Sequence, residues 1–147
     1  MQLLTIGYED ASVPAFIGTL QAARVTLLLD VREFPSSRRP GFSKTPLSKA
    51  LAAAGIGYRH ERALGAPPAL RRQLRASGDR ARFLTDYGRH LARQSALLDE
   101  LAATLTGRVA LMCLERDPKM CHRSIVAEAL RERAAVKVKD LFVPDAP

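Results

Sequence analysis

Two short apolar runs, residues 25–29 and 109–114, most constrain the fold of this chain of 147 residues. Each run has the length of a strand and is too short for a buried helix. Apart from Thr26, neither run contains the alternating polar residues of a strand with one face in water. Runs of this kind are typical of strands that are covered on both faces, so they predict the centre of a parallel sheet.

Amphipathic segments separate these runs from further short strands. Ser12 is a suitable helix N-cap, Pro46 and Pro68 suit the first turns of later helices, and apolar residues recur at helical spacing after each of them. Because strands that alternate with helices form parallel crossovers, we expect an α/β fold: a three-layer α/β/α sandwich with a mainly parallel sheet of about five strands, in one domain over residues 1–147. The expected strands cover residues 3–6, 25–29, 56–60, 109–114 and 136–139, the last at an edge, and the expected helices cover about 12–20, 45–55, 67–78, 83–105 and 121–133.

The composition is that of a protein from a reducing compartment. No apolar run approaches the roughly 18 residues of a membrane helix, and residues 1–7 lack the basic segment of a signal peptide. Two cysteines, Cys113 and Cys121, are too few for a disulfide framework. We therefore expect a cytoplasmic protein with no membrane partner.

The chain is strongly basic, with 23 Lys and Arg against 15 Asp and Glu and a net charge of +8. Such an excess favours anionic partners, such as nucleotides, nucleic acids or other phosphorylated molecules. A codon bias towards arginine explains the excess equally well. Only arginines that a motif places therefore support a function.

Segments that carry polar residues follow four of the expected strands at their carboxyl ends. These segments are residues 7–8, 30–32, 60–62 and 113–116. In a parallel sheet these ends meet at one edge, and ligands bind outside that edge. We therefore expect these four segments, which lie far apart in the sequence, to form one site.

Two of these segments carry cations suited to an anion. Residues 30–44 form a loop that prolines stiffen, and a stiff loop presents guanidinium groups with little ordering cost. Residues 113–124 run from a strand end to a helix start, where free N–H groups attract anions. The predicted anion-binding residues are Arg32, Arg38, Arg39, Lys44, Arg123 and Ser124.

Cys121 and His122, at the start of the last expected helix, are candidates for chemistry. A helix start and a neighbouring histidine favour a thiolate, so Cys121 is a candidate nucleophile. A buried, inert cysteine is the plainer alternative. Glu115 and Asp30 form a candidate general acid–base pair, although each carboxylate pairs equally well with a nearby arginine in a structural role.

Zinc is the one cofactor that these residues suggest. Cys113, Cys121 and His122, with Glu115 or His60, are ligand types that bind zinc. Their spacing matches none of the common zinc motifs, and no nucleotide-cofactor motif is present either. We therefore predict no cofactor and keep zinc as an alternative.

The run Asp-Val-Arg…Arg-Arg-Pro-Gly-Phe-Ser-Lys from Asp30 and the run Cys-x-Glu-x5-Cys-His-Arg-Ser from Cys113 resemble a bacterial and archaeal family known as domain of unknown function 488. The resemblance covers nearly the whole chain. It implies a compact α/β domain and says little about chemistry. The positions that match the motifs of the family are Asp30, Arg32, Arg38, Arg39, Phe42, Lys44, Cys113, Glu115, Cys121, His122 and Arg123.

These residues predict a domain that binds or acts on a phosphorylated or otherwise anionic small molecule, such as a nucleotide. Whether the protein is an enzyme is left open; as an enzyme it would use acid–base or thiol-assisted chemistry. The alternative is a non-catalytic nucleic-acid-associated protein. For that alternative, residues 59–93 hold nine arginines against three acids, but they lack the interleaved aromatic residues of a nucleic-acid surface.

Overall fold

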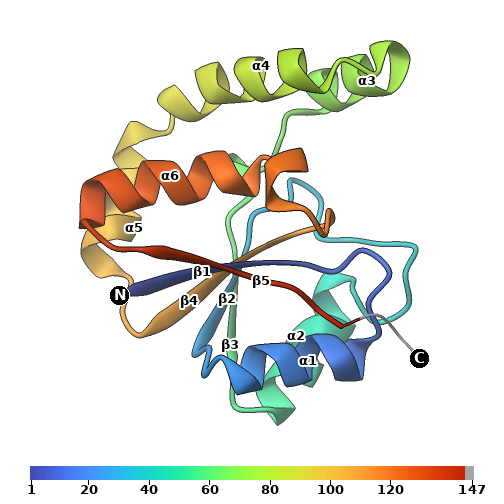
Figure 1. Ribbon diagram of the computed structural model, residues 1–147, viewed down its shortest axis with the longest axis vertical. Helices are drawn as coiled ribbons and strands as arrows, with labels where there is room; N and C mark the ends of the chain where they lie inside the picture. Colours follow the sequence, from blue (N-terminus) through green and yellow to red (C-terminus); the bar gives the residue numbers. More distant parts are fainter. Residues whose placement is uncertain (145–147) are drawn as a thin grey trace.

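A five-stranded sheet, in which every strand runs parallel to its neighbours, forms the middle layer of the protein (Figure 1). The structure is a computed structural model that describes residues 1–144. The α/β fold predicted from the sequence is confirmed. The strands are β1 (Gln2–Gly7), β2 (Leu27–Asp30), β3 (Gly57–His60), β4 (Arg108–Cys113) and β5 (Val138–Leu141), in the order β3-β2-β4-β1-β5.

Helices cover both faces of the sheet (Figure 1). Two helices pack on one face around Phe16 and Leu47, and three pack on the other around Tyr87 and Leu130. None of the helices in residues 1–144 has the length and apolar character needed to cross a bilayer. The helices are α1 (Val13–Ala22) and α2 (Lys44–Ala53) on the first face, α4 (Arg80–Ala92), α5 (Ser95–Thr104) and α6 (Arg123–Ala134) on the second, and α3 (Pro68–Ser77), which packs against α4.

The two apolar runs form β2 and β4, as their composition predicts. β4 is the central strand and β2 lies directly beside it. Both strands are covered on both faces, which is why polar residues are scarce in them. Asp30 at the end of β2 pairs with Met112, and Gly7 at the end of β1 pairs with Cys113, so three strands end at one edge.

One predicted helix is wrong in its extent. The stripe from Phe83 to Leu105 is split into α4 and α5 by a turn at Arg93 and Gln94. The apolar spacing of seven residues between Leu91 and Leu98 stays in helical register across this turn, and no glycine or proline marks it. The break is therefore invisible to a periodicity argument.

Close backbone approach shapes the carboxyl edge at two glycines. A Cβ atom at Gly7 would overlap the carbonyl of Glu115, and one at Gly65 would overlap the backbone of Glu33. Only glycine lets the segments after β1, β2 and β4 and the turn at Gly65 approach one another this closely. The two glycines thus allow the loops of the candidate site to pack together.

Candidate functional site

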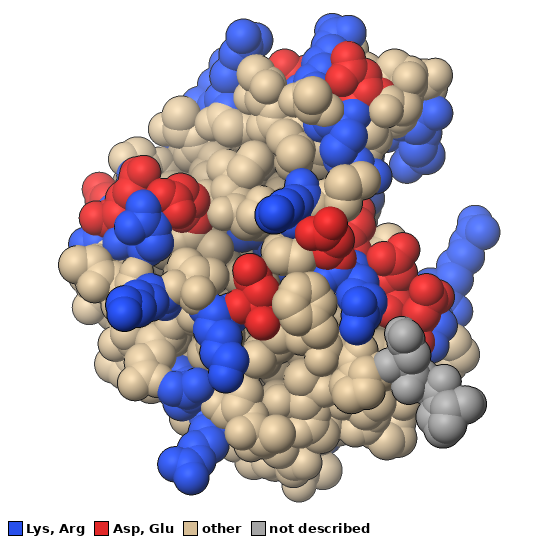
Figure 2. Space-filling view, in the orientation of Figure 1, with Lys and Arg blue, Asp and Glu red and all other residues tan. Residues whose placement is uncertain are grey.

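A cavity of about 600 Å³ lies outside the carboxyl ends of β1, β2 and β4. In Figure 1, α3 and the start of α4 stand over this edge of the sheet, and Figure 2 shows a hollow below them, bordered by Lys and Arg side chains. Segments far apart in the sequence form it, as the carboxyl-edge argument predicts. The cavity is lined by Tyr8, Arg32, Glu33, Phe34, Ser36, Ser37, Arg38, Arg39, Ala66, Arg71, Leu74, Arg75, Arg80, Phe83, Cys113, Leu114, Glu115 and His122.

Arg32 and Asp30 form a buried ion pair at the base of the loop that follows β2. The guanidinium donates from Nε to Oδ1 at 2.9 Å and from Nη2 to Oδ2 at 2.8 Å, and the backbone N–H of Arg32 also donates to Oδ1. Burial alone would lower the pKa of Arg32, but the hydrogen bonds and charge of Asp30 outweigh it and raise this pKa. The guanidinium of Arg32 is therefore held in its charged form.

The remaining donor of Arg32 fastens the same loop to the sheet. Nη1 donates to the carbonyl of Phe42 at 2.8 Å and to the hydroxyl of Tyr8 at 3.2 Å. The rings of Tyr8 and Phe42 stack with their centroids 4.8 Å apart. Arg32 thus connects Asp30 at the end of β2, Tyr8 after β1 and Phe42 on the far side of the loop, and its guanidinium donates a hydrogen bond to each of them.

Arg123 and Ser124 face away from the cavity. The side chain of Arg123 is fully buried, and its two terminal nitrogens donate to the carbonyls of Glu115 and Arg116. The hydroxyl of Ser124 donates to the carbonyl of Cys121 at 2.9 Å. Lys44 is exposed at the start of α2 and likewise lies outside the cavity. Arg123 therefore holds the loop after β4 in shape, and none of these three residues enters the site proposed below.

Arg38 and Arg39 do line the cavity, from the loop after β2. Arg39 is half-buried, and its Nε donates to the carbonyl of Ala11. Arg38 is exposed and forms no ion pair or hydrogen bond with residues 1–144. Three of the predicted anion-binding cations, Arg32, Arg38 and Arg39, therefore line the cavity, and Arg38 has its guanidinium open to a ligand.

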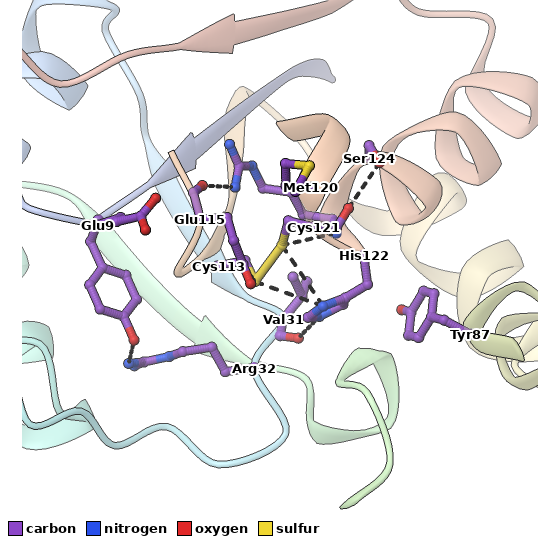
Figure 3. Close-up of a disulfide and its surroundings, with 12 residues drawn as sticks. Glu9, Val31, Arg32, Tyr87, Cys113, Glu115, Met120, Cys121, His122 and Ser124 are labelled. Atoms are coloured by element: carbon purple, nitrogen blue, oxygen red, sulfur yellow. Dashed lines mark hydrogen bonds between the residues drawn. A yellow bond between two sulfur atoms is a disulfide. The ribbon is translucent and has the colours of Figure 1, made fainter. Parts of the chain in front are cut away.

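Cys113 and Cys121 are joined by a disulfide (Figure 3). Two cysteines do not make a disulfide framework, but the fold brings this pair together from the end of β4 and the turn before α6. Cys113 lines the cavity, whereas Cys121 lies behind it and is buried. The sulfur that faces a ligand is therefore that of Cys113, and Cys121, the predicted nucleophile, is the partner behind it.

His122 packs between this disulfide and the ring of Tyr87 (Figure 3). Its Nε2 lies 2.8 Å from the carbonyl of Val31, which can only accept, so Nε2 carries a proton. Burial lowers the pKa of His122 to about 4, so the ring is neutral at pH 7. The lone pair of Nδ1 is then directed at the two sulfurs, each 3.8 Å away.

Glu115 completes the group around the disulfide. Its Oε2 lies 3.4 Å from the sulfur of Cys113, and its Oε1 lies 3.6 Å from Nη1 of Arg80 on α4. The other predicted acid, Asp30, is fully enclosed by its partners and does not line the cavity. His60, the other optional ligand of the alternative zinc site, has its Nε2 2.7 Å from the carbonyl of Arg32 and is not part of the close group formed by Cys113, Cys121 and His122.

Comparison with known protein families gives one finding. A family model described as "Domain of unknown function DUF488" matches residues 12–130. The chain belongs to the DUF488 family. Searches of curated proteins and of solved structures give no match.

Sequence reasoning missed the wall of this DUF488 cavity that α3 and α4 provide. Arg71, Arg75 and Arg80 line it together with Phe83. These arginines belong to the basic stretch whose abundance alone did not indicate a site. The signal that could have found them is the strongly amphipathic pattern of residues 68–77, with Leu70 and Leu74 on one side and arginines around them.

We predict that breaking the Asp30–Arg32 pair strongly destabilises the fold. Asp30→Asn leaves a buried guanidinium without its counter-charge, so the free energy of unfolding in urea should fall by about 3–5 kcal/mol. The matched control is Glu128→Gln, which breaks an exposed pair with Arg131 and should change little. A loss of unfolding free energy for Asp30→Asn as small as that for Glu128→Gln would show that the buried pair is dispensable.

A second prediction concerns His122 and pH. The ring ordinarily titrates at 6.5 and does so at about 4 in the folded protein. Between these values the unfolded chain binds a proton that the folded chain does not, so stability falls as the pH falls from 6.5 to 4. When the pH falls from 7 to 4.5, in EDTA, the free energy of unfolding of the wild-type protein should fall by about 2–3 kcal/mol more than that of His122→Gln. Parallel stability profiles would contradict the neutral, buried ring.

Proposed function

We propose that this DUF488 domain binds an anionic small molecule with an aromatic or apolar part, such as a mononucleotide, in the carboxyl-edge cavity. The observation that carries the proposal is the pairing of unsatisfied arginine side chains with an exposed aromatic ring in one cavity. A cavity of about 600 Å³ is of the size that small-molecule ligands occupy.

The cationic side of the cavity supports recognition of a phosphate or carboxylate. Arg38 and Arg75 make no ion pair with a carboxylate among residues 1–144. Arg71 shares Glu33 with Arg62, and its buried Nε has no partner. A buried donor without an acceptor is costly, and an anionic oxygen would satisfy it. These three guanidinium groups are the anion-binding residues of the proposal.

The apolar side of the cavity supports a ligand that is more than a bare anion. Phe34 is 49% exposed, although large aromatic side chains are usually buried. The guanidinium carbons of Arg62 and Arg71 lie 5.5 and 5.3 Å from the centre of its ring. Leu74 and Phe83 continue this surface. A planar base or another flat ring would stack on Phe34 while its anionic group meets the arginines.

The chemistry, if the domain is an enzyme, would come from the group at the base of the cavity. Cys113, Glu115 and His122 all line it. Reduced Cys113 would supply a thiol, with Nδ1 of His122 as its proton acceptor, and Glu115 would serve as an acid–base group. We place this function in the cytoplasm, where disulfides are usually transient and catalytic or redox-sensing. The Cys113–Cys121 pair would then be reduced for much of the time.

Nucleic-acid association is the alternative from another class. The arginines of α3 and α4 give it some support, and Figure 2 shows Lys and Arg side chains on this part of the surface. Two of these arginines, Arg82 and Arg89, however, already pair with Asp86 on α4, so part of the positive charge of this surface is neutralised. A cavity of about 600 Å³ with apolar side chains among its lining residues suits a single base better than a duplex, so we favour the small molecule.

Binding to a panel of AMP, GMP, CMP, UMP and inorganic phosphate, measured by calorimetry in EDTA, tests the proposal. Arg75→Ala should weaken binding of the preferred mononucleotide at least tenfold, since a charge-assisted bond contributes about 1.5–3 kcal/mol. Arg72→Ala is the matched control: Arg72 is an exposed arginine of the same helix that lies outside the cavity.

The two candidate functions give different results in this experiment. A mononucleotide that binds in about 0.15 M salt, with Arg75→Ala impaired and Arg72→Ala normal, supports the proposal. If no member of the panel binds, or if both variants lose equal affinity, the cavity is not an anion site. Binding of duplex DNA with a steep salt dependence, weakened by both variants, would instead favour nucleic-acid association.

A further inference from the structure

We propose that the reduced protein binds one Zn²⁺ ion through Cys113, Cys121, His122 and Glu115, at the base of the cavity. The metal site does not depend on the anion proposal, because zinc binding requires no other ligand. In the zinc-bound protein Cys113 and Nδ1 of His122 are ligands, so the thiol chemistry described above belongs to the metal-free reduced protein.

The distances among the candidate ligand atoms fit a small tetrahedral site. The two sulfurs and the nearest nitrogen of His122 lie within 4.8 Å of one another, and Nδ1 is 3.8 Å from each sulfur. Zn–S and Zn–N bonds of about 2.3 and 2.1 Å at a tetrahedral angle place sulfur and nitrogen about 3.6 Å apart. The ring therefore needs to move by only a few tenths of an ångström.

His122 is already oriented as a metal ligand. Its Nε2–H donates to the carbonyl of Val31, which fixes the tautomer and leaves the lone pair of Nδ1 for a metal. Tyr87 packs against the ring at a centroid distance of 4.8 Å and holds its plane (Figure 3). Metal-binding histidines are commonly oriented by a carbonyl on the opposite ring nitrogen in this way.

Glu115 gives the site a fourth ligand that faces the cavity. Its Oε2 lies 3.4 Å from the sulfur of Cys113, on the side that lines the cavity, although Glu115 stands outside the close group of Cys113, Cys121 and His122 and has to turn towards the metal to bind it. Catalytic zinc sites keep one position that a water or substrate can take. A carboxylate displaced by a ligand would open that position, and the cation would add to the attraction that the arginines exert on an anion.

The disulfide and the metal site are two states of the same pair. Two molecules of a small thiol reduce the Cys113–Cys121 bond: they give up two electrons and two protons to the two sulfurs and join as a disulfide. Zn²⁺ then replaces the proton of each thiol, and both protons pass to solvent. The sulfurs separate to the distance of about 3.8 Å that two Zn–S bonds require.

Titration with Co²⁺, a coloured substitute for zinc, tests the site on the reduced full-length protein. We expect one equivalent to bind with thiolate-to-cobalt charge-transfer absorption and the visible bands of a tetrahedral ion, and Zn²⁺ to displace it. Cys113→Ser, Cys121→Ser and His122→Gln should each weaken binding at least a hundredfold, and Glu115→Gln about tenfold. His90→Gln is the control, since His90 contacts the carbonyl of Ala63 outside the site.

Oxidised wild-type protein provides a comparison that does not depend on the folding of any variant. With the disulfide closed, it should bind no Co²⁺ with charge-transfer absorption. If the reduced protein shows no such absorption, or the oxidised protein binds Co²⁺ equally well, the site does not exist. No nucleotide is present here and EDTA is present in the nucleotide titration, so either proposal can fail without the other.

Discussion

The buried ion pair between Asp30 and Arg32 is the interaction on which the carboxyl edge depends. A carboxylate with no exposed surface accepts two bonds from the guanidinium and one from the backbone, and Tyr58 on β3 donates a further hydrogen bond to it. Burying two charges is costly, and only a fully satisfied geometry offsets this cost. Here the satisfied geometry also ties the end of β2 to β1, β3 and the loop that carries Arg38 and Phe34.

This anchoring explains why the most buried cations of the family motifs are not those available to a ligand. The guanidinium of Arg32 is bonded to Asp30, and the two terminal nitrogens of Arg123 donate to backbone carbonyls, while the buried Nε of Arg123 has no partner among residues 1–144 and does not line the cavity. The cations with donors left for a ligand are Arg38 on the anchored loop, Arg75 on α3, and Arg71 on α3, whose Nη2 pairs with Glu33 but whose Nε has no partner among residues 1–144. Arg32 and Arg123 thus stabilise the loops around the cavity, whereas Arg38, Arg71 and Arg75 give the cavity the positive charge that a ligand can reach.

The sequence was sufficient to predict the parallel sheet, because the runs that became β2 and β4 have a composition that only a doubly covered strand explains. The convergence of the segments after Gly7, Asp30 and Cys113 followed from the same argument. The partner of each arginine could not be predicted in this way, because Asp30 and Glu115 were equal candidates and only distances decide which of them an arginine contacts. The contribution of α3 was also missed, because its position over the edge depends on the packing of α3 on α4 and not on a local pattern.

The central claim is that the open arginines of the cavity bind one anionic molecule together. NMR of arginine Nε–H groups during a titration with AMP tests it most directly. We expect the signals of Arg38, Arg71 and Arg75 to shift along one saturating curve in about 0.15 M salt, while those of Arg72 and Arg133 stay in place. Shifts spread evenly over all exposed arginines, or none at the three cavity residues, would contradict it.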